Sequence, residues 1–215
     1  MEHEKGNIDD KIFRFIYIEA MRDAVIQLAY KGKKRHLWTL EEEMNSLKGI
    51  IERLIDKVLN DEYLSQEEYD EDFLKTTISV CNYINDKEKN DEFTFGNAQK
   101  LINIMLKYLF ISTYKDNSSR QKFDYCHCPM DQQLLKEVWS KRKKLPDNIT
   151  LEKREVFLDG WGKEDFEKDE NGEKRLPKRY LSFQESVRYL VELEKKDKEK
   201  KNPSENPLEY DYDKW

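Results

Sequence analysis

The chain has 215 residues and a formal net charge of −6, and 39% of its residues are charged while 37% are hydrophobic. A typical soluble domain is about 25% charged and about 45–50% apolar, so the hydrophobic core of this chain must be small for its length. The length fits one domain, with or without an additional segment, better than two full domains. Its 12 Tyr, 10 Phe and 4 Trp argue against disorder throughout, and its 7 Gly and 5 Pro provide too few tight turns for an all-β sandwich or barrel.

Helical spacing of apolar residues predicts an all-α fold. Capping boxes, in which Thr or Ser is followed three residues later by Glu, begin at Thr39, Ser65 and Ser182. Pro129 suits the first turn of a helix. In chain order we expect helices over residues 9–30, 40–58, 65–85, 97–114, 129–143 and 182–196, a short helix after Thr150, and polar loops at 86–92 and 115–124.

These elements suggest a simple domain organisation. We expect residues 1–160 to form a single helical domain, and residues 161–201 to form a connector and a C-terminal helix. Residues 202–215 follow a charged run and contain two prolines, which is typical of a mobile tail.

Several features bear on the location of the chain. No stretch approaches the roughly 18–20 apolar residues of a membrane span, and the first five residues lack the basic-then-apolar order of a signal peptide. We therefore expect a cytoplasmic protein with no membrane partner. Its three cysteines, Cys81, Cys126 and Cys128, are too few for a disulfide framework and are expected to be reduced.

Charge is distributed unevenly along the chain. Residues 1–95 carry 14 Lys and Arg against 22 Asp and Glu, whereas residues 96–160 carry 12 against 8 and residues 161–215 carry 13 against 15. Only the middle of the chain is basic. A local positive zone can attract phosphate over the short range that salt permits, although a chance fluctuation of composition is an equally good reading.

Two chemically capable residues lie near predicted helix starts, Lys100 in the most apolar helix and Asp131 after Pro129. The exposed N–H groups of a helix start favour a carboxylate and disfavour a protonated amine, so a desolvated Lys there tends to become a nucleophile. The spacing allows one helix, a return loop and a second helix whose start lies beside the first. Either residue could equally be an ordinary polar residue of a helix start.

Gly96, Lys100, Pro129 and Asp131 resemble the motif of the helix–hairpin–helix DNA glycosylases. That motif has a glycine-containing hairpin, a catalytic Lys four residues after its first Gly, an apolar helix and a Pro-x-Asp with a catalytic carboxylate. The Gln99-Lys100 pair, the spacing and a second Lys at position 107 look most like the archaeal-type 8-oxoguanine DNA glycosylases. The resemblance covers a glycosylase-like core at about residues 93–142.

The resemblance departs from the family at the hairpin, which usually reads Leu-Pro-Gly-x-Gly. Here Phe95 replaces the Pro and Ala98 replaces the second Gly. The overall fold that the resemblance implies is all-α, of the helix–hairpin–helix DNA glycosylase type, with a charged C-terminal extension.

The function that the resemblance implies is excision of a damaged or modified base from DNA, with no cofactor or metal. Lys100 would attack the sugar as a neutral amine and form a Schiff base that permits strand cleavage, while Asp131 would stabilise the positive charge developing on the sugar. The residues expected to contact DNA are Gly96, Asn97, Gln99, Lys107, Lys141, Arg142, Lys143 and Lys144, and Phe123, Tyr125 and Trp139 are expected to line the base pocket. Core packing explains the aromatic residues equally well, and solvated helix ends explain the basic run.

The sequence Cys126-His127-Cys128 is a second cluster of reactive residues. A zinc site needs about four ligands, and no second pair with suitable spacing follows. We therefore predict buried thiols and a polar His there, and no metal.

A second functional class also fits the sequence. Residues 61–72 contain seven carboxylates, which suits either a solvated surface or an acidic face that imitates a nucleic-acid backbone. In this alternative the chain is a non-catalytic acidic helical interaction protein, an inhibitor or decoy of a nucleic-acid-binding machine, whose partner is a basic protein.

Overall fold

The computed structural model describes residues 8–23, 41–89, 93–113, 117–197 and 201–214. Over these residues the chain is mostly helical, which confirms the all-α prediction. The α-helices are α1 (Asp10–Met21), α2 (Glu41–Leu59), α3 (Gln66–Glu88), α4 (Phe95–Thr113), α5 (Asn117–Gln121), α6 (Gln132–Ser140), α7 (Arg154–Phe157), α8 (Lys178–Lys196) and α9 (Pro207–Asp213). Two 3₁₀ turns, η3 (Arg142–Lys144) and η4 (Trp161–Lys163), and the antiparallel strands β1 (Glu167–Lys168) and β2 (Lys174–Arg175) complete the described chain.

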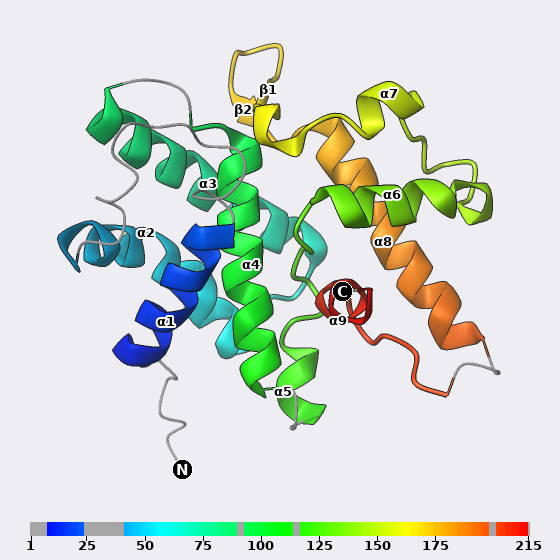
Figure 1. The fold of residues 1–215 in the computed structure, drawn as a ribbon, viewed down its shortest axis with the longest axis horizontal. Coiled ribbons are helices and arrows are strands. Elements are labelled where there is room, and N and C mark those ends of the chain that lie inside the picture. Colours follow the sequence, from blue (N-terminus) through cyan, green and yellow to red (C-terminus); the bar gives the residue numbers. More distant parts are fainter. Residues whose placement is uncertain (1–7, 24–40, 90–92, 114–116, 198–200, 215) are drawn as a thin grey trace.

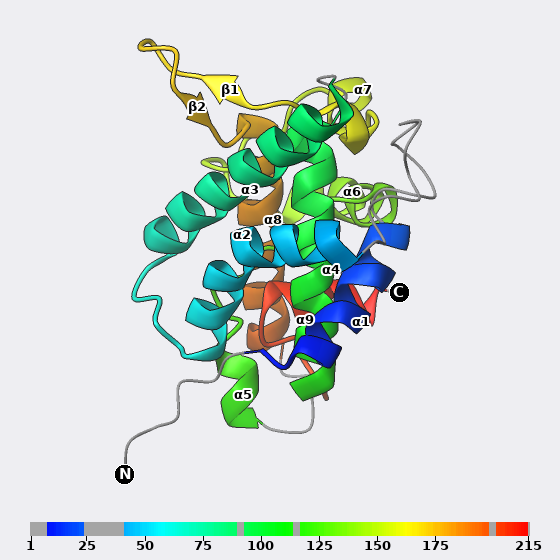
Figure 2. The same cartoon turned by 90° about the vertical axis from the view of Figure 1, so that its left-hand side faces the viewer.

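Helix α4 occupies the centre of the fold (Figure 1). It packs against α1, α3, η4 and α9, and its apolar side chains Leu101, Ile102, Met105 and Leu106 are completely buried. Figure 2 shows the β1–β2 hairpin projecting beyond the helices. Since α4 is covered on several sides, the polar residues that it carries are drawn into the protein interior.

The helix-start signals differ in their outcome. The Ser65 side chain accepts a hydrogen bond from the Glu68 N–H at 3.3 Å and caps α3, as predicted. The capping signal at Ser182 is wrong, because α8 already begins at Lys178, where the fully buried Tyr180 packs into the core. The signal at Thr39 and the expected continuation of the first helix beyond residue 23 lie outside the described residues.

The C-terminal segment differs most from the expectation of a mobile tail. Asn206 caps α9 by accepting a hydrogen bond from the Glu209 N–H at 3.0 Å, and Pro207 occupies the first turn. Leu208 and Tyr210 are fully buried, and α9 lies between α4 and α8 (Figure 1). The tail prediction relied on polar composition, but the apolar face of α9 is large enough to fix it to the core.

Among the described residues, no helix is both long enough and apolar enough to cross a membrane.

We expect Leu208→Ala to lower the free energy of unfolding by about 2–5 kcal/mol, because it removes a fully buried side chain and leaves a cavity. Leu64→Ala is the matched control, since Leu64 is 81% exposed and should change stability by less than about 0.5 kcal/mol. Urea unfolding of both variants measures the difference. If Leu208→Ala is as silent as Leu64→Ala, the C-terminal segment is not packed as described.

Candidate active site

The Lys100 side chain lies in the second turn of α4 and is nearly buried, with 7% of its surface exposed. Burial lowers the pKa of its amine below the ordinary value, although the carboxylates of Asp131, Asp23 and Asp211 act in the opposite direction. Asp131 has the strongest influence of the three. A lysine amine with a lowered pKa is a better nucleophile at neutral pH, because more of it is uncharged.

Asp131 is brought to the same region by the segment before α6. It is the N-cap of that helix, where its Oδ1 accepts a hydrogen bond from the Leu134 N–H at 2.9 Å. The helix expected from residue 129 would place Asp131 inside its first turn, but α6 begins one residue after Asp131, at Gln132. The capping geometry fixes one oxygen of the carboxylate and holds the side chain at the edge of α4.

Buried amide side chains hold the segment that leads to Asp131. Gln99 accepts a hydrogen bond from the Met130 N–H at 3.1 Å and donates one to the Met130 carbonyl at 3.3 Å. Gln184 contacts both backbone groups of Cys128 in the same way, at 3.1 and 2.9 Å. The two side-chain amides therefore satisfy the hydrogen-bonding groups of this backbone segment, as a neighbouring strand would. They also fix the position of the segment relative to α4 and α8.

A small cavity of 130 Å³ lies beside Asp131. This volume is well below the roughly 300–1,000 Å³ of pockets for drug-sized ligands, so the cavity has room only for a small group. Its walls are mainly apolar and aromatic. The lining residues are Asp23, Ile104, Lys107, Tyr108, Ile111, Pro129, Asp131 and Tyr212.

Two polar pairs border this cavity. The Lys107 ammonium lies 2.7 Å from an Asp211 oxygen, and both side chains are nearly inaccessible to solvent. The Tyr108 hydroxyl donates a hydrogen bond to Asp23 at 2.7 Å. Asp131, Asp23, Asp211 and Lys107 all act electrostatically on Lys100, so the start of α6, the residues after α1, and helices α9 and α4 contribute to one charged centre. Lys100 itself does not line the cavity.

Several residues expected to contact DNA are buried instead. Gly96 and Asn97 lie beneath the protein surface. Gln99 is fully buried, and its side-chain amide donates hydrogen bonds to the carbonyls of Gly96 and Met130. Lys107 was expected to face phosphate but is paired with Asp211. The structure therefore corrects the prediction for these four residues, because they lack the exposed surface that a contact with the DNA backbone requires.

The aromatic residues expected to form a base pocket also have other surroundings. Phe123 is fully buried against Phe110, with ring centroids 5.6 Å apart. Trp139 packs against Phe157, and Tyr125 lies near α3. None of Phe123, Tyr125 and Trp139 lines the cavity beside Asp131, so the structure does not place these three residues in a shared pocket there.

The basic run from Lys141 to Lys144 is divided between internal and solvent contacts. Lys141 is half-buried and forms an ion pair with Glu137 at 2.7 Å, and Arg142 lies 4.7 Å from the centre of the Trp139 ring. Lys143 and Lys144 are exposed in η3. Only the latter two therefore present largely unobstructed positive charge.

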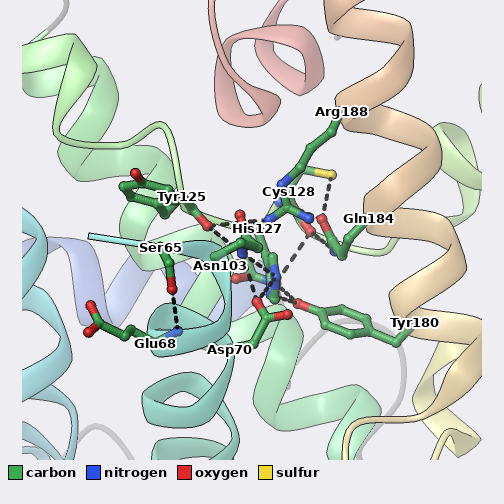
Figure 3. Close-up of polar contacts among 11 residues, drawn as sticks. Ser65, Glu68, Asp70, Asn103, Tyr125, His127, Cys128, Tyr180, Gln184 and Arg188 are labelled. Carbon is green, nitrogen blue, oxygen red and sulfur yellow. Dashed lines mark hydrogen bonds and ion pairs between the residues drawn. The ribbon is translucent and has the colours of Figure 1, made fainter. Parts of the chain in front are cut away.

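All three residues of the Cys126-His127-Cys128 sequence are fully buried. His127 and Cys128 belong to a network of polar contacts (Figure 3). His127 contacts Asp70 through Nε2 and the Tyr180 hydroxyl through Nδ1, both at 2.9 Å. Burial lowers the pKa of His127 to about 4, although the hydrogen bond to Asp70 favours its charged form. Burial also raises the pKa of both thiols, so neither Cys126 nor Cys128 has the character of a reactive thiolate.

Within the part of the chain that the structure describes, no three His, Cys, Asp or Glu side chains are grouped as a metal site.

Four residues of this region were not predicted from the sequence: Asp23, Tyr108, Asp211 and Tyr212. Asp211 and Tyr212 were assigned to a mobile tail, although the Asn206-Pro207 pair with Glu209 three residues after the Asn is a helix-start signal. Asp23 and Tyr108 carry no local signal, because their role depends on packing between α1 and α4.

The chain has no significant match to a protein-family model, a curated protein or a solved structure.

We expect His127 to make the protein sensitive to mild acid. In the unfolded chain its ordinary pKa is about 6.5, so between pH 6.5 and 4 the unfolded state binds a proton that the folded state excludes. Stability is therefore present above pH 6.5 and is lost as the pH falls. The free energy of unfolding should decrease by about 2 kcal/mol more between pH 7 and pH 5 in the native chain than in His127→Gln.

The comparison with His127→Gln removes the contribution of other titrating groups, such as Asp124, whose pKa burial raises to about 6. Urea unfolding at the two pH values measures the difference. Equal pH dependence in the two proteins would show that His127 titrates normally in the folded state.

Proposed function

We propose that the chain is a DNA base-excision glycosylase with lyase activity, as the resemblance to helix–hairpin–helix DNA glycosylases implies. The observation that supports this most strongly is the buried Lys100 amine, whose pKa is lowered and on which the carboxylate of Asp131, a residue that lines the small cavity, acts electrostatically. Lys and Asp fall at the positions of the family motif, and packing brings them into one charged centre. The α3–α4 pair, which precedes and carries Lys100, would be the helix–hairpin–helix unit.

The proposed reaction starts with neutral Lys100. Its nitrogen lone pair attacks the sugar carbon C1′, and the bond from C1′ to the base breaks with its electron pair leaving on the base. The new ammonium loses a proton, and the sugar ring opens to give an imine between Lys100 and C1′. Loss of the 2′ proton then expels the 3′ phosphate by elimination. Asp131 would stabilise the positive charge on the sugar during the first step.

The cavity beside Asp131 is the proposed receptor for the extruded base. A flipped base is held by contacts to its polar edge and by stacking on flat side chains. Lys107, which lines the cavity and is held by Asp211, can supply a donor, and Tyr108 and Tyr212 can supply aromatic surface. These residues replace Phe123, Tyr125 and Trp139 in the proposal.

The proposed DNA contacts outside the cavity are fewer than the sequence suggested. Lys143 and Lys144 are exposed and can bind phosphate without reading sequence. The alternative, an acidic interaction protein that binds a basic partner, remains the class to which failure of the enzyme tests would point.

We expect borohydride to trap a covalent adduct between the protein and duplex DNA that carries 8-oxoguanine or an abasic site, because it reduces the imine to a stable amine. Lys100→Gln should abolish the adduct, since an amide cannot form the imine. Denaturing electrophoresis of labelled DNA measures it. The control Lys75→Gln changes an exposed lysine of α3 and should retain native trapping.

Other lysines can react with an abasic site, so an adduct that survives Lys100→Gln would assign the trap to incidental chemistry. Absence of any adduct, together with DNA binding too weak to show a dependence on salt, would favour the acidic interaction protein.

We expect Asp131→Asn to slow removal of the base by about 10²–10⁴-fold at unchanged stability. Asn is as good an N-cap as Asp, so the hydrogen bond to the Leu134 N–H is kept while the charge is lost. Single-turnover kinetics on damaged duplex measure the rate. Trapping at a preformed abasic site, where no base remains to be removed, should be affected much less.

A further inference from the structure

The Lys100 amine lies against an aromatic ring that the proposed mechanism does not use. Its Nζ is 4.3 Å from the centre of the Trp161 ring, which belongs to η4. Trp161 is itself 93% removed from solvent, as its exposed fraction is 7%. The ring therefore covers the candidate nucleophile from one side, and it comes from a segment about 60 residues further along the chain.

The close approach of this segment depends on Gly96. A Cβ atom at position 96 would lie 1.7 Å from the Trp161 carbonyl oxygen and 2.8 Å from its carbonyl carbon. Both atoms belong to the backbone, so no rotation of a side chain could relieve the overlap. The Gly96 N–H also donates a hydrogen bond to the Glu164 carbonyl at 2.9 Å, and the Thr94 hydroxyl donates one to the Gly162 carbonyl at 2.8 Å.

Helix α8 anchors the same segment from the other side. The buried Arg179 guanidinium contacts the Glu164 carboxylate at 2.5 Å. It also donates hydrogen bonds to the carbonyls of Phe157 and Asp159, at 3.0 and 2.6 Å. A charged group buried with three partners indicates that the position of η4 is closely defined.

We propose that Trp161 is a positioning residue for Lys100: its ring covers the amine and limits access of water to it, and Gly96 is required because it lets the η4 backbone approach α4. The role of the amine in catalysis rests on the proposed function. Its covering by the ring does not, and can be measured without DNA.

Two effects of the ring oppose each other. The face of an aromatic ring attracts an ammonium group, which favours the charged amine. Exclusion of water disfavours it, and burial is the largest influence on Lys100, whose pKa is lowered. Removal of the ring should therefore hydrate the ammonium and raise the pKa of Lys100 toward its ordinary value.

The charges around Lys100 strengthen this expectation. Asp131 at the start of α6, Asp23 after α1 and Asp211 in α9 all favour the ammonium form, and Lys107 in α4 opposes it. With the ring removed, the three carboxylates would act on a hydrated amine whose desolvation no longer offsets their effect. On the η4 side, the charges of Glu164 and Arg179 cancel each other in their ion pair.

The test is competitive acetylation of the full chain across pH, with the reactivity of each lysine followed by mass spectrometry of peptides. In the native protein Lys100 should titrate below the exposed lysines Lys143 and Lys75. In Trp161→Leu its midpoint should move to higher pH, so that its reactive fraction at pH 7 falls about tenfold, while Trp161→Phe should stay near the native value.

Gly96→Ala tests the placement of the ring with Trp161 intact. It should shift the Lys100 midpoint in the same direction as Trp161→Leu. Gly160→Ala is the matched control, because a Cβ there has no atom within 4 Å, and it should leave the midpoint unchanged. The pH profile of borohydride trapping should move in parallel with the acetylation midpoint if the proposed function is correct.

The outcomes separate the two proposals. A native Lys100 that titrates with the exposed lysines, or a midpoint that falls or stays constant in Trp161→Leu, overturns the covering role whatever the activity. The native titration requires no variant, so it decides the matter even if Trp161→Leu fails to fold. If the acetylation midpoints shift as expected but the protein traps no DNA, the covering role of Trp161 is supported and the proposed glycosylase activity is rejected.

Discussion

A helix surrounded by protein must satisfy its polar side chains without the help of bulk water, and α4 is in this position from Phe95 to Lys107. Gln99 does so by pairing with the backbone of Met130, and Lys107 by pairing with Asp211. The Lys100 ammonium lies against the Trp161 ring and is influenced by three carboxylates. Among the described residues it forms no direct ion pair with any of them, so its charge is less fully compensated than that of Lys107. The arrangement of the candidate site follows from these three solutions.

The same constraint explains why α4 can be central to both the stability of the fold and the candidate site. Buried ion pairs contribute little net stability, because loss of hydration offsets most of their attraction. A pair such as Lys107–Asp211 is therefore better understood as a device that fixes the position of α9 against α4. The apolar contacts of α4 and α9 supply the stability, while the charges specify how the helices meet and leave one amine with its charged form disfavoured.

Features that depend on local chemistry were predictable from the sequence, and features that depend on packing were not. The Ser65 cap needs only the N–H of Glu68, three residues away, and it forms as expected. Helix α8 begins at Lys178 because Tyr180 is buried, and this burial outweighs the local capping signal at Ser182. In the candidate site, Lys100 and Asp131 were found from a short motif, whereas Asp211 and Trp161 become visible only when distant segments meet.

The contact between Lys107 and Asp211 also bears on synthesis of the chain. At about 5–20 residues per second, the ribosome needs about 5–20 s to make the stretch between the two residues. During that interval α4 already carries its ammonium group but the partner carboxylate does not yet exist. Complete enclosure of α4 is therefore unfavourable until α9 has been made, so the nascent chain should keep this side of α4 open to water or to a chaperone.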